Sequence, residues 1–367
     1  MRKPPWRVPA ALSFALLGAL DCGGGTSKTG SPAATSPSGK IYVTVYGTDQ
    51  VEVFDATTHA ALPAIALGSG RGPAILLKTP DGKKLYSANW KDNTISAIDL
   101  STSGVTTIQL DSRPWVVAMS PAGDVVYAGL NSNKIAVIST TTDAIARNID
   151  TGGLLPESII VSPDGATLYV AIVDQNSIGS LLGGTIEAIS SSTGAIVHPA
   201  LTVGMTPAWI TISADGATVF TLNFLSNDVS VVDTAMWKLS NTIPVGSNAE
   251  PIIGAVAPGG PLVVTNFGSA NVAIVDPATG AVVHTFPTSG RPVGIDFSAD
   301  GAHGYVTDFG ANSLTVPLDP LDIESGDLTS AIGTGPGEIV EFDPSTGAVT
   351  GAPITTMGAG PTSIVVE

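Results

Sequence analysis

Five charged side chains, three arginines and two glutamates, lie within two residues of a proline that recurs along the chain, and two tryptophans lie close by. Arginines beside aromatic rings suit an anionic or planar ligand, because a guanidinium binds anions through paired hydrogen bonds and stacks on rings. The alternative is that the arginines and glutamates pair with one another around a narrow solvated channel. The candidate ligand-binding residues are Arg71, Arg113, Trp115, Glu157, Trp209, Glu250 and Arg291.

A second group of candidates is acidic and lies in the segment 311–337. Hard cations such as calcium bind several oxygen ligands at once, so these side chains are candidate metal ligands. Their spacing is not that of an EF-hand loop, and the alternative is a surface insertion without a metal. The four candidates are Asp319, Asp322, Glu324 and Asp327.

Signatures of catalysis are sparse in this sequence. The four histidines, His59, His198, His284 and His303, are spread along the chain and none lies beside a recurring proline. Neither a Gly-x-Ser-x-Gly nucleophile turn nor a His-Glu-x-x-His zinc motif is present. We therefore nominate no catalytic residue and expect no cofactor.

The elements that must position these residues repeat with a period of roughly 40–50 residues, which is the signature of a β-propeller. Each period begins with a proline, hereafter a marker proline, which opens a short apolar run. A turn such as Ser162-Pro163-Asp164-Gly165 or Ser213-Ala214-Asp215-Gly216 follows the run, and three further strand-like segments complete the repeat. The marker prolines are Pro73, Pro114, Pro156, Pro207, Pro251, Pro292 and Pro361.

The last repeat is split between the two ends of the chain. Pro361 opens a strand that has no turn after it, whereas Ser36-Pro37-Ser38-Gly39 is a turn with no strand before it. A propeller has to join its two ends or leave strand edges unpaired. The sequence therefore predicts an all-β, seven-bladed propeller over residues 36–367, closed by the C-terminal strand pairing into the N-terminal blade.

The second strands carry a recurring motif, seen in Tyr42-Val43-Thr44-Val45, Tyr169-Val170-Ala171-Ile172 and Tyr305-Val306-Thr307-Asp308. This motif resembles the YVTN repeat of bacterial and archaeal seven-bladed propellers, and the resemblance covers about residues 36–367. It implies the fold and a site on the face formed by the loops between second and third strands. It does not select a function, since the superfamily includes binding proteins, surface antigens and lactonase-like enzymes.

The N-terminal segment predicts export. Three basic residues precede the apolar stretch Val8–Leu20, and the single cysteine of the chain, Cys22, follows it. This pattern indicates a signal peptide over residues 1–22, with Cys22 as a candidate lipidation site, although Asp21 is unusual in a lipobox. Residues 23–35 read as a flexible linker. We expect location in the periplasm or at the cell surface, with membrane contact only through the lipid.

The net charge of −16 disfavours nucleic acid as a partner, because nucleic-acid-binding domains carry basic patches. We expect a monomer that acts as a binding or interaction scaffold of the cell envelope and binds an envelope protein or a small anionic ligand. The main alternative is a lactonase-like hydrolase or isomerase that uses the central funnel. A third is an accessory factor in cofactor or electron-transfer metabolism.

Overall fold

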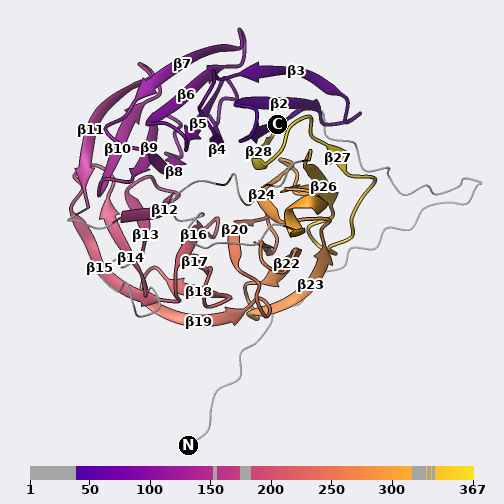
Figure 1. Ribbon diagram of the computed structural model, residues 1–367. Coiled ribbons are helices and arrows are strands. Elements are labelled where there is room, and N and C mark those ends of the chain that lie inside the picture. Colours follow the sequence, from indigo (N-terminus) through magenta and orange to yellow (C-terminus); the bar gives the residue numbers. More distant parts are fainter. Residues whose placement is uncertain (1–38, 152–154, 174–182, 316–327, 329–331, 333–334) are drawn as a thin grey trace, which may run out of the picture. The chain divides into compact units, whose positions relative to one another are not determined.

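A computed structural model describes residues 39–151, 155–173, 183–315, 328, 332 and 335–367. The described strands form seven four-stranded antiparallel sheets arranged as blades around a central channel (Figure 1). This arrangement confirms the predicted seven-bladed propeller. The predicted signal peptide, the linker and Cys22 lie outside the described residues, as do Asp319, Asp322, Glu324 and Asp327.

Within each blade, the strands follow one another from the central channel to the outer rim. Blade 1 holds β28 (Pro361–Val366), β1 (Lys40–Val45), β2 (Gln50–Asp55) and β3 (Ala61–Ala66). Blade 2 holds β4 (Pro73–Lys78), β5 (Lys84–Asn89), β6 (Thr94–Asp99) and β7 (Gly104–Gln109). Blade 3 holds β8 (Pro114–Met119), β9 (Val125–Leu130), β10 (Lys134–Ser139) and β11 (Ala144–Asp150). Blade 4 holds β12 (Leu155–Val161), β13 (Thr167–Val173), β14 (Gly184–Ser190) and β15 (Ile196–Val203).

Blade 5 holds β16 (Pro207–Ile212), β17 (Thr218–Asn223), β18 (Asp228–Asp233) and β19 (Lys238–Pro244). Blade 6 holds β20 (Pro251–Val256), β21 (Leu262–Asn266), β22 (Asn271–Asp276) and β23 (Ala281–Pro287). Blade 7 holds β24 (Pro292–Phe297), β25 (Gly304–Asp308), β26 (Glu338–Phe342) and β27 (Ile354–Thr355). A short 3-10 helix, η2 (Ala311–Thr315), follows β25. Among the described residues, no helix is long and apolar enough to span a membrane.

The marker prolines fix where the inner strands begin. Six of the seven inner strands start at their marker proline, and β12 starts one residue earlier. The pairing register shifts directly after each of these prolines, for example between Pro73 and Ile75 and between Pro207 and Trp209. A proline has no amide hydrogen to donate to the neighbouring strand, so a bulge is the natural place for it.

The turns after four of the inner strands, in blades 2, 4, 5 and 7, are built alike. In the turn of blade 4, the Ser162 hydroxyl donates to the Asp164 carboxylate at 2.5 Å and accepts the Thr167 amide at 2.9 Å. Gly165 follows with a φ of +75°, a left-handed conformation that is least strained for glycine. The hydrogen bond from Ser162 and the one from the Ala166 amide lower the pKa of Asp164, so its carboxylate holds the turn closed.

Ring closure takes place in blade 1, as predicted. Strand β28 pairs antiparallel with β1, with Ile41 opposite Val366 and Val43 opposite Ile364. The loop before β28 is held by Glu52 of β2, whose side chain is fully buried. Its two carboxylate oxygens accept the backbone amides of Met357 and Gly358, each at 2.9 Å. The carboxylate thus places the last loop so that β28 can reach the edge of β1.

The free edge of β28 is held from both neighbouring blades. Lys78 of β4 donates to the carbonyl oxygen of Val366 at 2.7 Å, and the Val366 amide donates to the carboxylate of Asp296, in β24, at 2.8 Å. Burial raises the pKa of Asp296 to about 6, although its hydrogen bonds and the nearby Lys78 act in the opposite direction. Blades 2 and 7 are therefore both tied to the closing strand.

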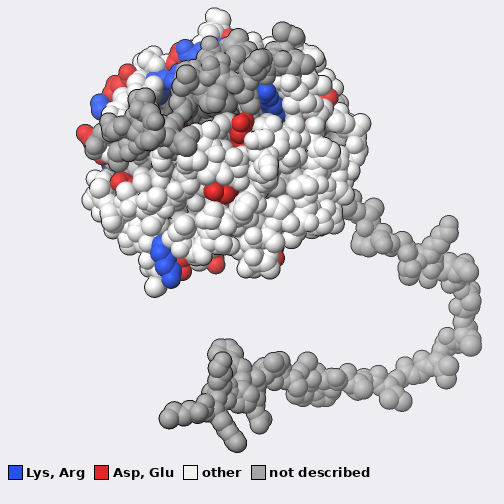
Figure 2. All heavy atoms as spheres, turned by 60° about the horizontal axis from the view of Figure 1, so that its bottom comes forward, with Lys and Arg blue, Asp and Glu red and all other residues white. Residues whose placement is uncertain are grey.

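Charge is sparse on one side of the ring. Figure 2 shows the side on which the outer strands β15 and β19 lie, and most of its surface is uncharged. Large apolar side chains are exposed along these outer strands and at β23, among them Ile196, Val197, Leu239 and Val283. The strongly negative net charge is therefore not spread evenly over the propeller.

We expect Glu52→Ala to lower the free energy of unfolding by about 2–4 kcal/mol, because two buried amides of the closing loop would lose their acceptor. Denaturant unfolding of both proteins measures the change. Gln50→Ala is the control, since it removes only the weak side-chain bond from Gln50 to Glu52 at 3.3 Å. Equal effects of the two substitutions would show that Glu52 does not hold the closure.

We expect Asp296 to make stability depend on pH between about 4 and 6. Its pKa is higher in the folded protein than the ordinary value of 3.8, so in this interval the folded state keeps a proton that the unfolded state has released. Its contribution is therefore fully present below about pH 4 and is lost as the pH rises to about 6. Denaturant unfolding of wild type and Asp296→Asn at several pH values tests this, and parallel pH profiles would contradict it.

Candidate functional site

A cavity of about 100 Å³ lies on the central channel at the end where the inner strands begin. The residue that follows each of the seven marker prolines lines it, so every blade contributes one side chain. The marker proline sets this position because it pairs with the second strand at the start of the inner strand, and the residue after it lies in the bulge. These seven residues are Ala74, Trp115, Glu157, Ala208, Ile252, Val293 and Thr362.

Aromatic side chains from a second position complete the lining. Trp90, Phe224, Phe267 and Phe309 each come directly after the second strand of their blade. Their amides donate to the carbonyl of the residue before the marker proline of the same blade: Trp90 to Gly72 at 2.8 Å, Phe224 to Thr206 at 2.8 Å, Phe267 to Glu250 at 3.2 Å and Phe309 to Arg291 at 3.0 Å. This repeated bond turns the four rings toward the channel. The candidates chosen from the sequence did not include them, although an aromatic residue at this position in successive repeats was a readable signal.

The cavity is closed by two further contributions. Trp209 of β16 adds a large ring, and Leu328, from the insertion after β25, is buried against the same space. Trp90 and Trp115 stack nearly parallel, with ring centroids 5.0 Å apart, and the Trp90 indole donates to the Trp115 carbonyl at 3.0 Å. The insertion of blade 7 therefore supplies an apolar wall residue, a role that its acidic composition did not suggest.

Among the described residues of the lining, polar side chains are few. They are Glu157, Thr206 and Thr362. The Thr362 hydroxyl donates to the Pro73 carbonyl at 3.0 Å. The Thr206 hydroxyl is buried and has no hydrogen-bond partner among the described residues. Thr206 also has a φ of +52°, which is rare for a β-branched residue. An unsatisfied polar group on a strained backbone is typical of a functional site.

Glu250 lies just outside the lining and shares both features of Thr206. Its φ is +48°, and its Oε2 atom is buried without a hydrogen-bond partner in the described structure. Burial raises the pKa of Glu250, while the nearby Arg291 guanidinium acts in the opposite direction. Its carbonyl accepts the amide of the lining residue Phe267, so its backbone is fixed to the cavity wall.

Two of the three predicted arginines lie against rings that line the cavity. The Arg113 guanidinium lies 5.2 Å from the centroid of the Trp115 ring, and that of Arg291 lies 5.3 Å from the centroid of Phe267. Burial lowers the pKa of both arginines, while Glu157 near Arg113 and Glu250 near Arg291 raise it. The predicted couples of Arg and Glu therefore exist as electrostatic neighbours at the mouth of the channel.

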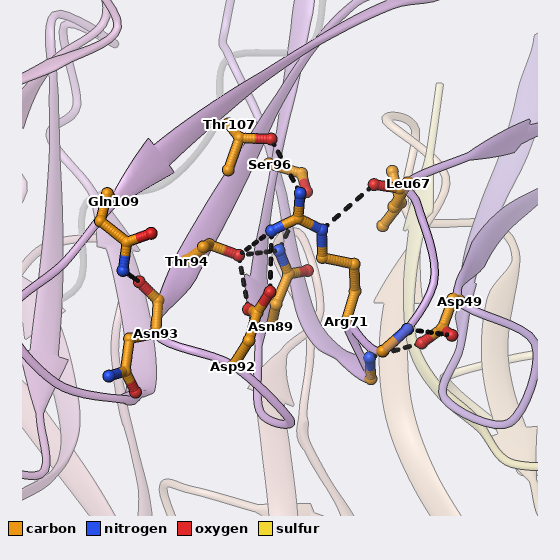
Figure 3. Close-up of polar contacts among 12 residues, drawn as sticks. Asp49, Leu67, Arg71, Asn89, Asp92, Asn93, Thr94, Ser96, Thr107 and Gln109 are labelled. Atoms are coloured by element: carbon orange, nitrogen blue, oxygen red, sulfur yellow. Dashed lines mark hydrogen bonds and ion pairs between the residues drawn. The ribbon is translucent and has the colours of Figure 1, made fainter.

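Arg71 does not belong to this group, so its position differs from the one expected from the sequence. Its guanidinium points along blade 2 toward β6 and β7 (Figure 3), where it bonds to Asp92 at 2.7 Å, Thr94 at 2.9 Å and Thr107 at 3.1 Å. Its Nε donates to the Leu67 carbonyl at 3.3 Å. The reason is its position: Arg71 precedes its marker proline by two residues, whereas Arg113 and Arg291 precede theirs by one.

None of the four histidines lines the cavity. His59 and His303 both contact Glu341 at the seam of blades 1 and 7, at 3.3 and 2.6 Å. His198 stacks on Trp237 at the outer rim, with ring centroids 4.9 Å apart, and His284 lies in the outer strand β23. Within the described part of the chain, no three His, Cys, Asp or Glu side chains are arranged to hold a metal ion.

A closed ring of seven four-stranded blades with an aromatic cavity at the channel mouth defines a seven-bladed propeller with a concave central site. The chain belongs to the YNCE-like beta-propeller family, whose model matches residues 5–339. No curated protein matches the chain at a significant level.

Solved structures share the fold at low sequence identity. A chain of Kuenenia stuttgartiensis hydrazine synthase has a TM-score of 0.64 at 20% identity, covering 77% of this chain and 96% of that one. The dihydro-heme d1 dehydrogenase NirN has a TM-score of 0.62 at 15% identity, with coverages of 91% and 76%. The "putative 6-phosphogluconolactonase" of Bacteroides uniformis has a TM-score of 0.67 at 14% identity, with coverages of 89% and 99%. These likenesses establish the fold and do not select a function.

We expect Arg71→Ala to lower the free energy of unfolding by about 1–2 kcal/mol, because a partly exposed charged side chain with several hydrogen bonds is lost. Denaturant unfolding measures this. Lys83→Ala is the matched control, because Lys83 forms only an exposed pair with Asp81 and its loss should change stability by less than about 0.5 kcal/mol. A stability of Arg71→Ala equal to that of the control would contradict the structural role.

Proposed function

We propose that this chain is an exported binding propeller of the cell envelope and that the central cavity is its ligand site. The observation that supports it is that all seven blades contribute to one apolar, aromatic cavity, whose wall includes a strained threonine with a buried, unpaired hydroxyl. Small-molecule sites are concave and mostly apolar, with a few polar groups that fix orientation, and the cavity has this composition. Export through residues 1–22 and anchoring at Cys22 belong to the same proposal.

The scaffold role is consistent with the placement of the ionisable groups. The histidines lie at the seam and at the outer rim, and Arg113 and Arg291 are held against rings of the cavity wall. Binding with retention of the ligand needs only burial and a few matched hydrogen bonds, and the cavity offers both.

A hydrolase is the second candidate, and Glu250 is the observation that favours it. A carboxyl group with a raised pKa and an unpaired oxygen beside a cavity is the kind of group that acts as a general acid or base. Hydrolysis of a sugar δ-lactone by wild type and by Glu250→Gln distinguishes the two functions. Turnover that Glu250→Gln abolishes would establish the enzyme and overturn the scaffold role.

We expect Ala208→Leu to abolish ligand binding, because the added carbon atoms occupy a cavity of only about 100 Å³. Wild type and variant are incubated with a small-molecule extract of the cell envelope, and retained compounds are identified by native mass spectrometry. Ala122→Leu, in the exposed turn at the other end of β8, is the control and should bind as wild type does. Identical retention by both variants would remove the cavity as the site.

A further inference from the structure

The polar side chains of the cavity wall are held by the protein itself. Glu157 is an electrostatic neighbour of Arg113, so its charge is balanced at the mouth of the channel. The Thr362 hydroxyl donates to the Pro73 carbonyl, and the Thr206 hydroxyl oxygen is buried within the wall rather than exposed to the cavity. The described lining therefore offers no uncompensated charge to a bound ligand.

An added charge of either sign would be unfavourable in this cavity. The guanidinium groups of Arg113 and Arg291 already lie 5.2 and 5.3 Å from the ring centroids of Trp115 and Phe267, so a bound cation would lie near two positive charges. A bound anion would lie near the Glu157 carboxylate instead. Either ion would lose its hydration among the rings without gaining a free partner, and burying a charge without a partner is costly.

The rest of the described wall is hydrocarbon. It consists of aromatic rings and of aliphatic side chains such as Ile252 and Val293. Apolar cavities stay dry and take up small apolar molecules, because water gains no hydrogen bonds in them. An apolar occupant is removed from water and restores the dispersion contacts that the lining atoms lack. The rings are those of Trp90, Trp115, Trp209, Phe224, Phe267 and Phe309.

The size of the cavity limits the occupant. At about 100 Å³ it is smaller than the ~150 Å³ cavity that takes up benzene. Benzene has six carbon atoms, so the same packing leaves room here for about four carbon atoms. One residue from each of the seven blades surrounds the space, which favours a compact, branched group over a flat ring.

On the basis of the proposed binding function, we propose that the cavity binds the compact, uncharged hydrocarbon group of a neutral ligand. A branched group of about four carbon atoms fills the space among the rings, and its affinity comes from apolar surface removed from water. The charges at the mouth, Arg113 with Glu157 and Arg291 with Glu250, are balanced within the protein and select against ions. This ligand differs from the small anion that the arginines suggested in the sequence.

Three probes of nearly the same shape test the absence of charge. The alcohol 3,3-dimethylbutan-1-ol ends in a tert-butyl group, choline has a positively charged nitrogen in place of the central carbon of that group, and 3,3-dimethylbutanoate is the anion. Each is titrated into the full chain at constant ionic strength and followed by tryptophan fluorescence and calorimetry. We expect the alcohol to bind at least about tenfold more tightly than either ion, because the ions lose hydration without gaining a partner.

Two neutral probes and an enlarged cavity test the size. Wild type should bind 3,3-dimethylbutan-1-ol about tenfold more tightly than 2-cyclohexylethanol, although the cyclohexyl group is more apolar, because the larger ring overfills the space. Ile252→Ala shortens a lining side chain and should reverse this preference. Val256→Ala, a truncation at the other end of β20, is the matched control and should keep the wild-type preference. Circular dichroism checks that each variant is folded.

The outcomes separate this inference from the broader proposal. Binding of either ion as tightly as the alcohol, lost in Ala208→Leu, would keep the cavity as a ligand site and overturn the uncharged ligand. Tighter binding of 2-cyclohexylethanol by wild type, or an unchanged preference in Ile252→Ala, would overturn the match in size. Binding of the alcohol that persists in Ala208→Leu would place it outside the cavity and overturn the inference as well. Absence of binding by all the probes would reject this class of ligand, while ligand retention from the envelope extract remains the separate measure of the binding function.

Discussion

The pairing of β28 with β1 is the constraint on which the rest of the propeller depends. Seven blades form a ring only if the strand that ends the chain joins the sheet that begins it, and the register from Ile41 opposite Val366 onward achieves this. The same strand brings Thr362 into the cavity wall, and the Gly360 carbonyl just before it accepts the Tyr46 amide. The cavity therefore exists only in the closed ring, and closure and binding depend on one strand.

Once the ring is closed, the marker prolines decide what faces the channel. The residue after each proline lines the cavity, and the carbonyl of the residue before it holds the first residue beyond a second strand. The backbone arrangement is thus the same in most blades, while the two side chains it presents are free to vary. This separation explains how one fold supports unrelated functions, because a change of a few side chains changes the cavity without disturbing the strands.

Most of the fold could be predicted from the sequence because its determinants are local. A proline that shifts strand register and a Ser-x-Asp-Gly turn each act over a few residues and recur around the ring, and the split repeat indicates which strand and which turn belong to the same blade. The direction of long side chains is not local. Arg71 and Arg113 both lie within two residues of a marker proline, yet Arg71, which is one residue further from its proline, bonds to Asp92 on the blade, whereas Arg113 lies against Trp115. The place of Leu328 in the cavity wall could not be predicted either, because this residue lies within an insertion that stands out in the sequence only for its acidic residues.

The composition of the cavity also bears on what could bind there. A calcium or magnesium ion gives up its hydration only for several oxygen ligands, and the described lining offers one carboxylate and two hydroxyls among rings. Glu157 is moreover an electrostatic neighbour of Arg113, so the charge at the mouth of the channel is balanced within the protein. Burial of apolar surface against the rings is then the main source of affinity that the cavity can offer, and a few polar groups at its edge would set the orientation of a ligand.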